Sequence, residues 1–595
     1  MNLLAIYHRA TDNFCYCLDE DNIVISIKTG YDINKVTLYY CDPFEKGIMG
    51  GNHCIVGTPI EMTEVKKLKN HLHWSVKIKP KYKRLVYYFS FENDTEKYYM
   101  YEDRFLTPKE FKNFNQRQQL FTFPFMNPVD IFKTPDWVND TVWYQIFVDR
   151  FCNGNPELNP KDVKPWSSPN EKVASKDFYG GDIPGITSKI EYLKDLGITG
   201  LYLTPIFEAA SNHKYNTTDY SKIDSCFGTD EDMIALVNKA HKNGIKVMLD
   251  GVFNHSGEFF KPWQDVLKNG PSSEYYDWFM INEWPFIERG KNAHSGIYYA
   301  FAFFDSMPKL NTNNPKVREY IVNILKSWVG KYDIDGLRMD VAGEISHKLC
   351  KEIRSALKEL KPDFYILGEL WHDSTPWLRG DEYDSVMNYM FSDCLSDFWI
   401  NDEITSLDFE HKINRCYTMY PLQVNKVLFN LLDSHDTIRL ATKLNDMAKF
   451  YQQLSVLFTM PGTVCIYYGT EVALEGSYDP DCRRCMPWRE IFNGVYNDKI
   501  SIIKQLITLR KTYQALRSND YEFNNANTNS RIINYIKKDD NDNKIMVTLN
   551  VSDKDFDINS ILIESKSITV KDILFSNLYE NNILKPNGTL IYTFE

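Results

Sequence analysis

The chain has 595 residues, which exceeds the size at which a single hydrophobic core keeps growing, so several domains are expected. Its composition, 43% hydrophobic and 25% charged, is that of an ordinary soluble globular protein. The net charge of -12, with no sustained block of like charge, argues against nucleic acid or an anionic membrane as the main partner.

The N-terminal segment predicts a cytoplasmic protein. Residues 1–9 lack a positive region followed by an apolar stretch and a small-residue cleavage site, so no signal peptide is expected. Apolar runs elsewhere are too short to span a bilayer. The 12 cysteines are scattered along the chain, which fits a reducing compartment better than a disulfide framework.

Residues 1–130 predict an N-terminal β-sandwich. Segments rich in β-branched and aromatic residues recur there with the alternation of half-buried strands, at 23–28, 36–40, 73–78 and 85–91. The prolines at 124 and 128 then mark a linker that ends near Pro135.

Residues 131–512 predict a (β/α)8 TIM barrel, because strand and helix patterns alternate, as in parallel sheets. The eight expected strands are 142–148, 200–203, 245–250, 334–340, 364–369, 385–388, 427–433 and 464–468. Helical patterns lie between them, for example at 190–196, 230–243, 315–332 and 347–360.

Two further regions complete the predicted multidomain architecture. Residues 256–314 are too long for a simple loop between a strand and a helix, so we expect a subdomain inserted at the C-terminal face of the barrel. After a helix at 499–512, the strand patterns at 531–537 and 544–550 predict a C-terminal β-sheet domain over 513–595.

Charged residues stand at the ends of several predicted barrel strands. Asp340 and Glu369 end the fourth and fifth strands, and Asp436 follows the seventh, so all three should meet over the mouth of the barrel. Arg338 and Asp340 share one face of their strand, where the arginine would keep the aspartate ionised while nearby negative charge keeps Glu369 protonated. A buried structural ion pair is the alternative for Arg338 and Asp340 alone, but one ionised and one protonated carboxyl group are what glycosidic cleavage requires.

These strand-end motifs together resemble the α-amylase family of glycoside hydrolases over nearly the whole chain. The resemblance implies that Asp340 is the nucleophile, Glu369 the general acid/base and Asp436 the transition-state stabiliser. It also implies a set of substrate-binding residues: Tyr215, His255, Arg338, Trp371, His435, Asp479 and Arg483. Tyr215 would stack on the sugar being cleaved, and Trp371 would lie on the acceptor side.

The segment Met307-Pro-Lys-Leu-Asn311 resembles the marker of the neopullulanase, cyclomaltodextrinase and maltogenic amylase subfamily. That resemblance implies cleavage of α-1,4-glucosidic bonds in cyclodextrins, maltooligosaccharides, pullulan or starch, with transfer to acceptor sugars as a second outcome. It also implies a homodimer formed through the N-terminal domain, and no organic cofactor. The preferred substrate and the oligomer size are not readable from the sequence.

A calcium site is the remaining prediction. Asn153, Asn155, Gly180 and Asp182 resemble a calcium loop of some relatives, and such oxygen ligands suit Ca²⁺. Asn155 replaces an acidic ligand of those relatives, which lowers the charge of the loop. A turn stabilised by asparagine and glycine alone is the alternative.

Two other classes of protein stay open from the sequence. A non-catalytic glucan-binding protein could use the same scaffold, since fold does not fix function. A metal-dependent hydrolase could use the His and Asp residues around His255 and Asp436, although Arg338 would be an unfavourable neighbour for a divalent cation.

Overall fold

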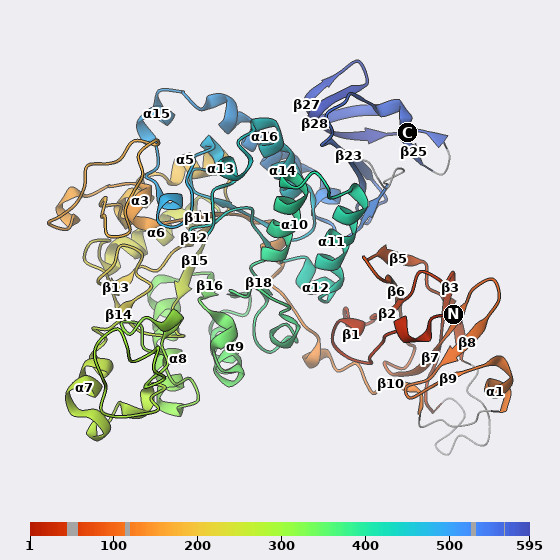
Figure 1. Cartoon of the computed structure of the whole chain (residues 1–595), viewed down its shortest axis with the longest axis horizontal. Coiled ribbons are helices and arrows are strands. Elements are labelled where there is room, and N and C mark those ends of the chain that lie inside the picture. The colour runs from red at the N-terminus through yellow and green to blue at the C-terminus, as the bar shows by residue number, and fades with distance from the viewer. Residues whose placement is uncertain (45–56, 114–118, 525–530, 564–565) are drawn as a thin grey trace. The chain divides into compact units, whose positions relative to one another are not determined.

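The computed structural model describes residues 1–44, 57–113, 119–524, 531–563 and 566–595 (Figure 1). The chain divides into two compact units. The first holds Met1–Lys133 together with Leu378–Gly380 and Ile404–Asn425, and the second holds Thr134–Trp377, Asp381–Glu403 and Lys426–Glu595. Each unit is described by itself.

The first unit is built on two antiparallel sheets. One has the strand order β1-β2-β6-β5, and the other β4-β3-β7-β8-β9 with β10 also paired to β7. Their bounds are β1 Cys15–Cys17, β2 Ile23–Thr29, β3 Lys35–Cys41, β4 Thr58–Glu61, β5 Glu64–Lys67, β6 Leu72–Ile78, β7 Leu85–Glu92, β8 Lys97–Met100, β9 Phe105–Leu106 and β10 Phe121–Phe123. The predicted N-terminal sandwich is therefore confirmed, and the short strands β1, β4, β5, β8, β9 and β10 are additions to it.

Alternation along the strands explains why these two sheets pack on each other. Ile23, Ile25 and Ile27 of β2 share one core with alternate residues of β7, such as Tyr87 and Phe89. Successive side chains of a strand point to opposite faces, so one face of each sheet supplies this core. The helices α1 (Pro108–Asn113), α11 (Ser406–Thr418) and α12 (Leu422–Asn425) belong to the same unit.

The burial of His73 in β6 leads us to expect that the first unit is sensitive to acid. The His73 side chain is buried, neither ring nitrogen bonds to another described residue, and burial lowers its pKa to about 3. The unfolded chain takes up a proton near pH 6.5 and the folded unit does not, so stability falls as the pH falls from 6.5 toward 3, by about 2 kcal/mol at pH 5. We expect His73→Phe to remove this loss. Hydrogen exchange of β6 at pH 7 and pH 5, corrected for intrinsic rates, measures it, and an unchanged pH dependence in the variant would contradict it.

The second unit contains the predicted barrel. Eight strands pair in parallel in the order β18-β17-β16-β15-β12-β11-β20-β19, and a parallel bridge between Met387 and Phe429 joins the two ends of the sheet. The strands are β11 Val142–Ile146, β12 Gly200–Leu203, β15 Lys246–Gly251, β16 Gly336–Met339, β17 Tyr365–Gly368, β18 Ser385–Val386, β19 Phe429–Asn430 and β20 Thr463–Tyr467. All eight lie within or beside their predicted ranges, although only two residues of the predicted strand 427–433 pair as β19.

Large apolar side chains fill the barrel interior. Trp143 of β11, Tyr202 of β12, Met248 of β15 and Tyr365 of β17 lie in one buried cluster. The rings of Trp143 and Tyr365 stack with their centroids 5.9 Å apart. Because this layer closes the barrel, the polar residues that follow each strand are displayed at its C-terminal mouth.

Helices follow the barrel strands as predicted. The main ones are α5 Ile190–Leu196, α6 Asp230–Lys242, α8 Pro315–Tyr332, α9 His347–Leu360, α10 Tyr389–Ile400, α14 Met447–Thr459 and α16 Asn497–Thr512. Between β15 and α8 the inserted segment carries α7 (Lys261–Asn269) and short 3-10 turns. Within the described residues, no helix has both the length and the apolar character needed to cross a membrane.

The C-terminal region of the second unit is a sheet packed against α14. Its order is β21-β22-β23-β28-β24, with β27 also paired to β28, and the bounds are β21 Tyr521–Phe523, β22 Ile532–Lys538, β23 Lys544–Asn550, β24 Phe556–Asp557, β27 Val570–Glu580 and β28 Ile583–Phe594. Gln452 of α14 donates to the backbone oxygens of Asn550 and Gly588, each at 2.9 Å. These bonds fix the sheet to the helix that follows the seventh barrel strand.

Candidate active site

Arg338 is the centre of the site. It lies on β16, is fully buried, and its Nη1 donates to Oδ1 and Oδ2 of Asp250 at 2.9 and 3.0 Å and to Oδ1 of Asp340 at 2.8 Å. Nη2 lies 2.8 Å from Oε2 of Glu369, a close ion pair without the alignment of a hydrogen bond. One guanidinium therefore joins carboxylates from three neighbouring strands, β15, β16 and β17.

The backbone just after Asp340 has a strained conformation that directs a backbone N–H at Glu369. Asp340 follows the last residue of β16, and the next residue, Val341, has φ of 46°, a left-handed conformation that a β-branched residue rarely adopts. This turn points the Val341 N–H at Oε2 of Glu369, 2.9 Å away, while the Trp371 Nε1–H donates to Oε1 at 3.2 Å. Both oxygens of Glu369 are thus held in place.

The cluster has one positive group, Arg338, and three carboxyl groups, those of Asp250, Asp340 and Glu369. Burial raises the pKa of Asp340 well above its usual range, Glu369 and Asp250 raise it further, and Arg338 opposes the rise. The sequence predicts that Arg338 keeps Asp340 ionised. The two side chains do form an ion pair, but the effect of burial on the pKa of Asp340 outweighs that of the arginine, so the shift is opposite to the predicted one. Three carboxyl groups around one cation favour retention of a proton within the cluster, as one acid and one base require.

Tyr215 and His435 lie against the same cluster. The Tyr215 hydroxyl is 2.9 Å from Oδ2 of Asp250 and 2.7 Å from Nε2 of His435, and the two rings stack with an angle of 4° between their planes. His435 is buried, and burial together with Arg483 and Arg338 lowers its pKa well below the ordinary value. The imidazole is therefore neutral at physiological pH.

Asp436 lies at the more open side of the site. Its Oδ2 is 3.2 Å from Nε2 of His435, its Oδ1 is 3.4 Å from Nη2 of Arg483, and its side chain is 33% exposed. Arg483 also pairs with Asp479 at 2.9 Å. This open carboxylate, flanked by a cation, is suited to hydrogen-bonding with ligand hydroxyls.

The two remaining predicted substrate residues join the same network. His255 Nε2 lies 3.1 Å from the backbone oxygen of Tyr215, and its ring stacks on Phe301 of the inserted segment. Trp371 stacks on Tyr389 with centroids 3.5 Å apart and remains 57% exposed. All ten predicted catalytic and substrate-binding residues are therefore brought together at the mouth of the barrel.

The four predicted calcium residues also lie together, in a hydrogen-bonded turn. Both oxygens of Asp182 accept backbone N–H bonds, from Gly154, Asn155 and Gly185, so Asp182 caps α4 (Ile183–Ser188). Gly180 packs so tightly against Asn153 and Asn159 that a Cβ would lie 2.6 Å from Asn153 Nδ2.

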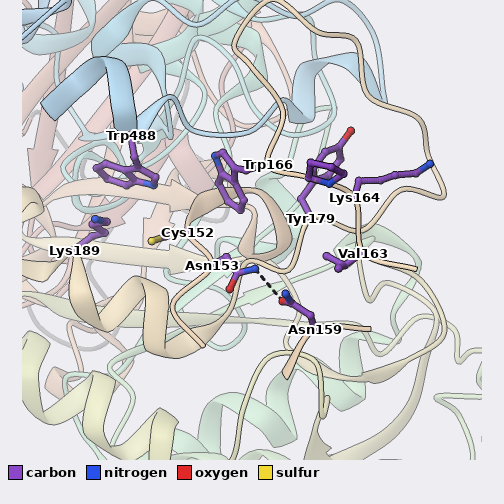
Figure 2. Close-up of a pocket in the computed structure, with 10 residues that line it drawn as sticks. Cys152, Asn153, Asn159, Val163, Lys164, Trp166, Tyr179, Lys189 and Trp488 are labelled. Carbon is purple, nitrogen blue, oxygen red and sulfur yellow. Dashed lines mark hydrogen bonds between the residues drawn. The ribbon is translucent and has the colours of Figure 1, made fainter. Parts of the chain in front are cut away.

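The surroundings of this turn do not favour a cation. A pocket of about 540 Å³ lies beside this turn. Asn153 Nδ2 donates to Asn159 Oδ1 at 2.9 Å, and Figure 2 shows this hydrogen bond among the residues that line the pocket. Among the described residues that line it are Lys164 and Lys189, and none of them is a carboxylate. Asn153 Oδ1 is buried and has no hydrogen-bond partner in the described part of the chain, so this atom is free to coordinate. As they stand, these residues fit a capped turn better than a calcium ion.

Calcium removal is expected to leave the fold unaffected. A single carboxylate whose oxygens already bind backbone amides offers a calcium ion little charge. The midpoint of thermal unfolding should therefore be the same in excess calcium and in excess EGTA. A higher midpoint in calcium, lost on replacing Asn153 by alanine, would identify this turn as a calcium site.

Some residues of the active-site network, among them Tyr202, Gln145 and Val341, are not singled out by the sequence motifs. Tyr202 donates to Oδ2 of Asp250 at 2.8 Å, Gln145 lies 2.8 Å from Nδ1 of His435, and Val341 supplies the N–H to Glu369. Gln145 could have been found from the sequence, because a glutamine in the otherwise apolar strand Val142–Ile146 indicates a buried polar contact. The roles of Tyr202 and Val341 depend on a buried hydroxyl and a backbone dihedral angle, which sequence patterns do not encode.

The fold and the site define an enzyme with converging carboxyl groups at the mouth of a TIM barrel. Two family models match the chain: the alpha amylase catalytic domain over residues 145–544 and the alpha amylase N-terminal ig-like domain over residues 1–127. The chain belongs to the α-amylase family and is a glycoside hydrolase.

Similar proteins lie in the subfamily expected from the sequence. A cyclomaltodextrinase of Geobacillus thermopakistaniensis (strain MAS1) is 43% identical over 560 residues, which are 92% of this chain and 91% of the relative. An intracellular maltogenic amylase of Bacillus subtilis is 41% identical over 518 residues, which are 87% of this chain and 85% of the relative. A solved structure of a cyclomaltodextrinase matches with a TM-score of 0.88 at 37% identity, covering 100% of this chain and 99% of that chain.

Proposed function

We propose that this enzyme cleaves α-1,4-glucosidic bonds of cyclodextrins and maltooligosaccharides, and also acts on pullulan and starch. The observation that carries the proposal is the buried Arg338 between Asp250, Asp340 and Glu369. The similar proteins named for cyclomaltodextrin and maltose support the choice of glucan.

In the proposed mechanism the configuration at the anomeric carbon is retained. An oxygen of Asp340 attacks the anomeric carbon while Glu369 gives its proton to the leaving glycosidic oxygen, so the C–O bond breaks as the glycosyl ester forms. Glu369 then removes a proton from water or from an acceptor sugar hydroxyl, whose oxygen displaces Asp340. Asp436, with His435 and Arg483 beside it, binds the hydroxyls of the same sugar.

Trp371 supports the proposal that acceptor sugars compete with water. It is exposed, and its Nε1 holds Glu369, the residue that activates the acceptor in the second step. An exposed indole face suits the stacking of a sugar ring.

Substrate preference is tested by initial rates on β-cyclodextrin, pullulan and soluble starch, with analysis of the products. We expect turnover of all three, with glucose and maltose among the products from cyclodextrin. Folded protein with no turnover of cyclodextrin, pullulan, starch or maltotriose would overturn the proposed function.

We further propose that the enzyme is a cytoplasmic homodimer that uses its N-terminal sandwich domain as the interface. The relative named as intracellular supports the location, and the subfamily marker Met307–Asn311 supports the dimer. Light scattering of the full chain and of a chain starting at Thr134 tests the interface. A full chain that is monomeric at micromolar concentration would contradict it.

A further inference from the structure

A chain of four contacts, two of them buried and the two at the Tyr215 hydroxyl partly buried, runs from the first barrel strand into the active site. Gln145 Nε2 lies 2.8 Å from Nδ1 of His435, Nε2 of His435 lies 2.7 Å from the Tyr215 hydroxyl, and that hydroxyl lies 2.9 Å from Oδ2 of Asp250. Arg338 binds the far end of the chain at Asp250. Gln145 and His435 are each only 1% exposed, so water does not substitute for these partners.

The protons along this chain can be placed from its Arg338 end. Burial raises the pKa of Asp250. Arg338 opposes this rise, and so do the hydroxyls of Tyr202 and Tyr215, which donate hydrogen bonds to the Asp250 carboxylate. We therefore take Asp250 as an ionised acceptor. The single proton of the Tyr215 hydroxyl therefore points at Asp250. The Tyr215 oxygen must then accept from His435, which places a proton on Nε2.

Neutrality of the imidazole fixes the other nitrogen. A neutral histidine carries one ring proton, so Nδ1 of His435 is an acceptor when Nε2 is protonated. An acceptor at Nδ1 requires a donor facing it, and the Gln145 amide supplies one at 2.8 Å. Gln145 Oε1 is buried and has no hydrogen-bond partner among the described residues, so the N–H group is the part of this amide that is used.

We propose that Gln145 is a positioning residue that holds His435 as the neutral tautomer protonated on Nε2. This inference deepens the proposed function and rests on it. The Nε2–H is directed at Tyr215 and lies 3.2 Å from Oδ2 of Asp436. In the other tautomer a lone pair would face both of these oxygens, and the resulting repulsion would displace Tyr215 and Asp436 from the sugar.

The same amide opposes a second proton on His435, because an Nδ1–H would meet the Gln145 N–H. Three other groups near His435, Arg338, Arg483 and His213, also disfavour the cation, whereas the carboxyl groups of Glu369 and Asp436 favour it. Asp250 acts on the ring only through the Tyr215 hydroxyl. Replacing the amide by a carboxylate changes only the group opposite Nδ1 and should therefore reverse the preference of the ring.

Gln145→Glu is the test variant. Its carboxylate accepts from Nδ1–H, so at pH 7 and above the proton leaves Nε2, and kcat/KM on maltotriose should fall about tenfold, as expected for one lost hydrogen bond in the transition state. At pH 5 a second proton on His435 restores the Nε2–H, so the loss relative to the wild-type enzyme at the same pH should shrink. If the substitution only perturbed folding, the loss of kcat/KM would not become smaller at pH 5.

Gln145→Met is the matched variant without polar atoms. This variant no longer favours either neutral tautomer of His435. We therefore expect kcat/KM to fall about threefold to tenfold, by the same factor at pH 5 and at pH 8. Gln453→Met, at a buried glutamine of α14 outside the site, controls for the loss of a buried amide and should leave kcat/KM unchanged. Thermal unfolding of each variant shows that it is folded.

The outcomes separate this inference from the proposed function. Wild-type enzyme without glucan turnover overturns the proposed function itself. Active wild-type enzyme with a Gln145→Glu variant that retains full activity at every pH, or that loses the same fraction at pH 5 and pH 8, overturns the role of Gln145. A loss at pH 8 that shrinks at pH 5 supports it.

Discussion

Asp340→Asn is expected to lower kcat on maltotriose by about 10⁴-fold or more while the dissociation constant of the substrate changes little. The amide keeps the shape of the side chain and its place beside Arg338, but it cannot form the glycosyl ester. Steady-state kinetics and calorimetric titration with maltotriose measure the two effects separately.

The stability of this variant distinguishes a functional carboxylate from a structural one. Burial raises the pKa of Asp340, so its ionisation is unfavourable in the folded state, and Asp340→Asn should be at least as stable as the wild-type enzyme at pH 7. Asp335 is the matched control, since it is buried just before β16, where it binds His241 and Lys361. Asp335→Asn should lower stability and keep turnover, and a reversed pattern would remove Asp340 from the nucleophile's role.

Glu369→Gln is expected to lower kcat on maltotriose by about 10³-fold, because the glutamine cannot protonate the leaving sugar. Maltosyl fluoride needs no such proton, since fluoride is a good leaving group. With this substrate we expect a burst of one fluoride per active site and then slow turnover, because the variant also lacks the base of the second step. Rapid-mixing measurement of fluoride release shows the burst.

Azide provides the control for this second prediction. As a small anionic nucleophile it needs no base, so it should restore steady turnover of maltosyl fluoride by Glu369→Gln and should have no such effect on Asp340→Asn. An equal loss of activity on maltotriose and on maltosyl fluoride would contradict an acid/base role for Glu369.

Much of this architecture follows from local patterns in the sequence. The helix α8 runs from Pro315 to Tyr332 as predicted because Asn314 caps it, a proline occupies its first turn and Asp333 ends it in a left-handed conformation. The barrel strands are recognisable as short apolar runs that end in a charged residue, such as Asp340 or Glu369. These signals lie within a few residues of the features they predict.

Features that depend on partners distant in the chain are not predictable in this way. The short strands β18 and β19 are defined by their neighbours in the barrel more than by their own residues. The raised pKa of Asp340 depends on burial and on carboxylates from β15 and β17, and the tautomer of His435 depends on Gln145, 290 positions away. The positive φ of Val341 contradicts the preference of valine, so only the tertiary structure accounts for it.

The identity of the nucleophile is tested most directly by trapping the glycosyl-enzyme. Glu369→Gln incubated with maltosyl fluoride should accumulate one maltosyl group per protein, and mass spectrometry of the proteolysed adduct should place it on the peptide that contains Asp340. An adduct on a different carboxylate would contradict the account, as would turnover by the wild-type enzyme that inverts the configuration of the anomeric carbon.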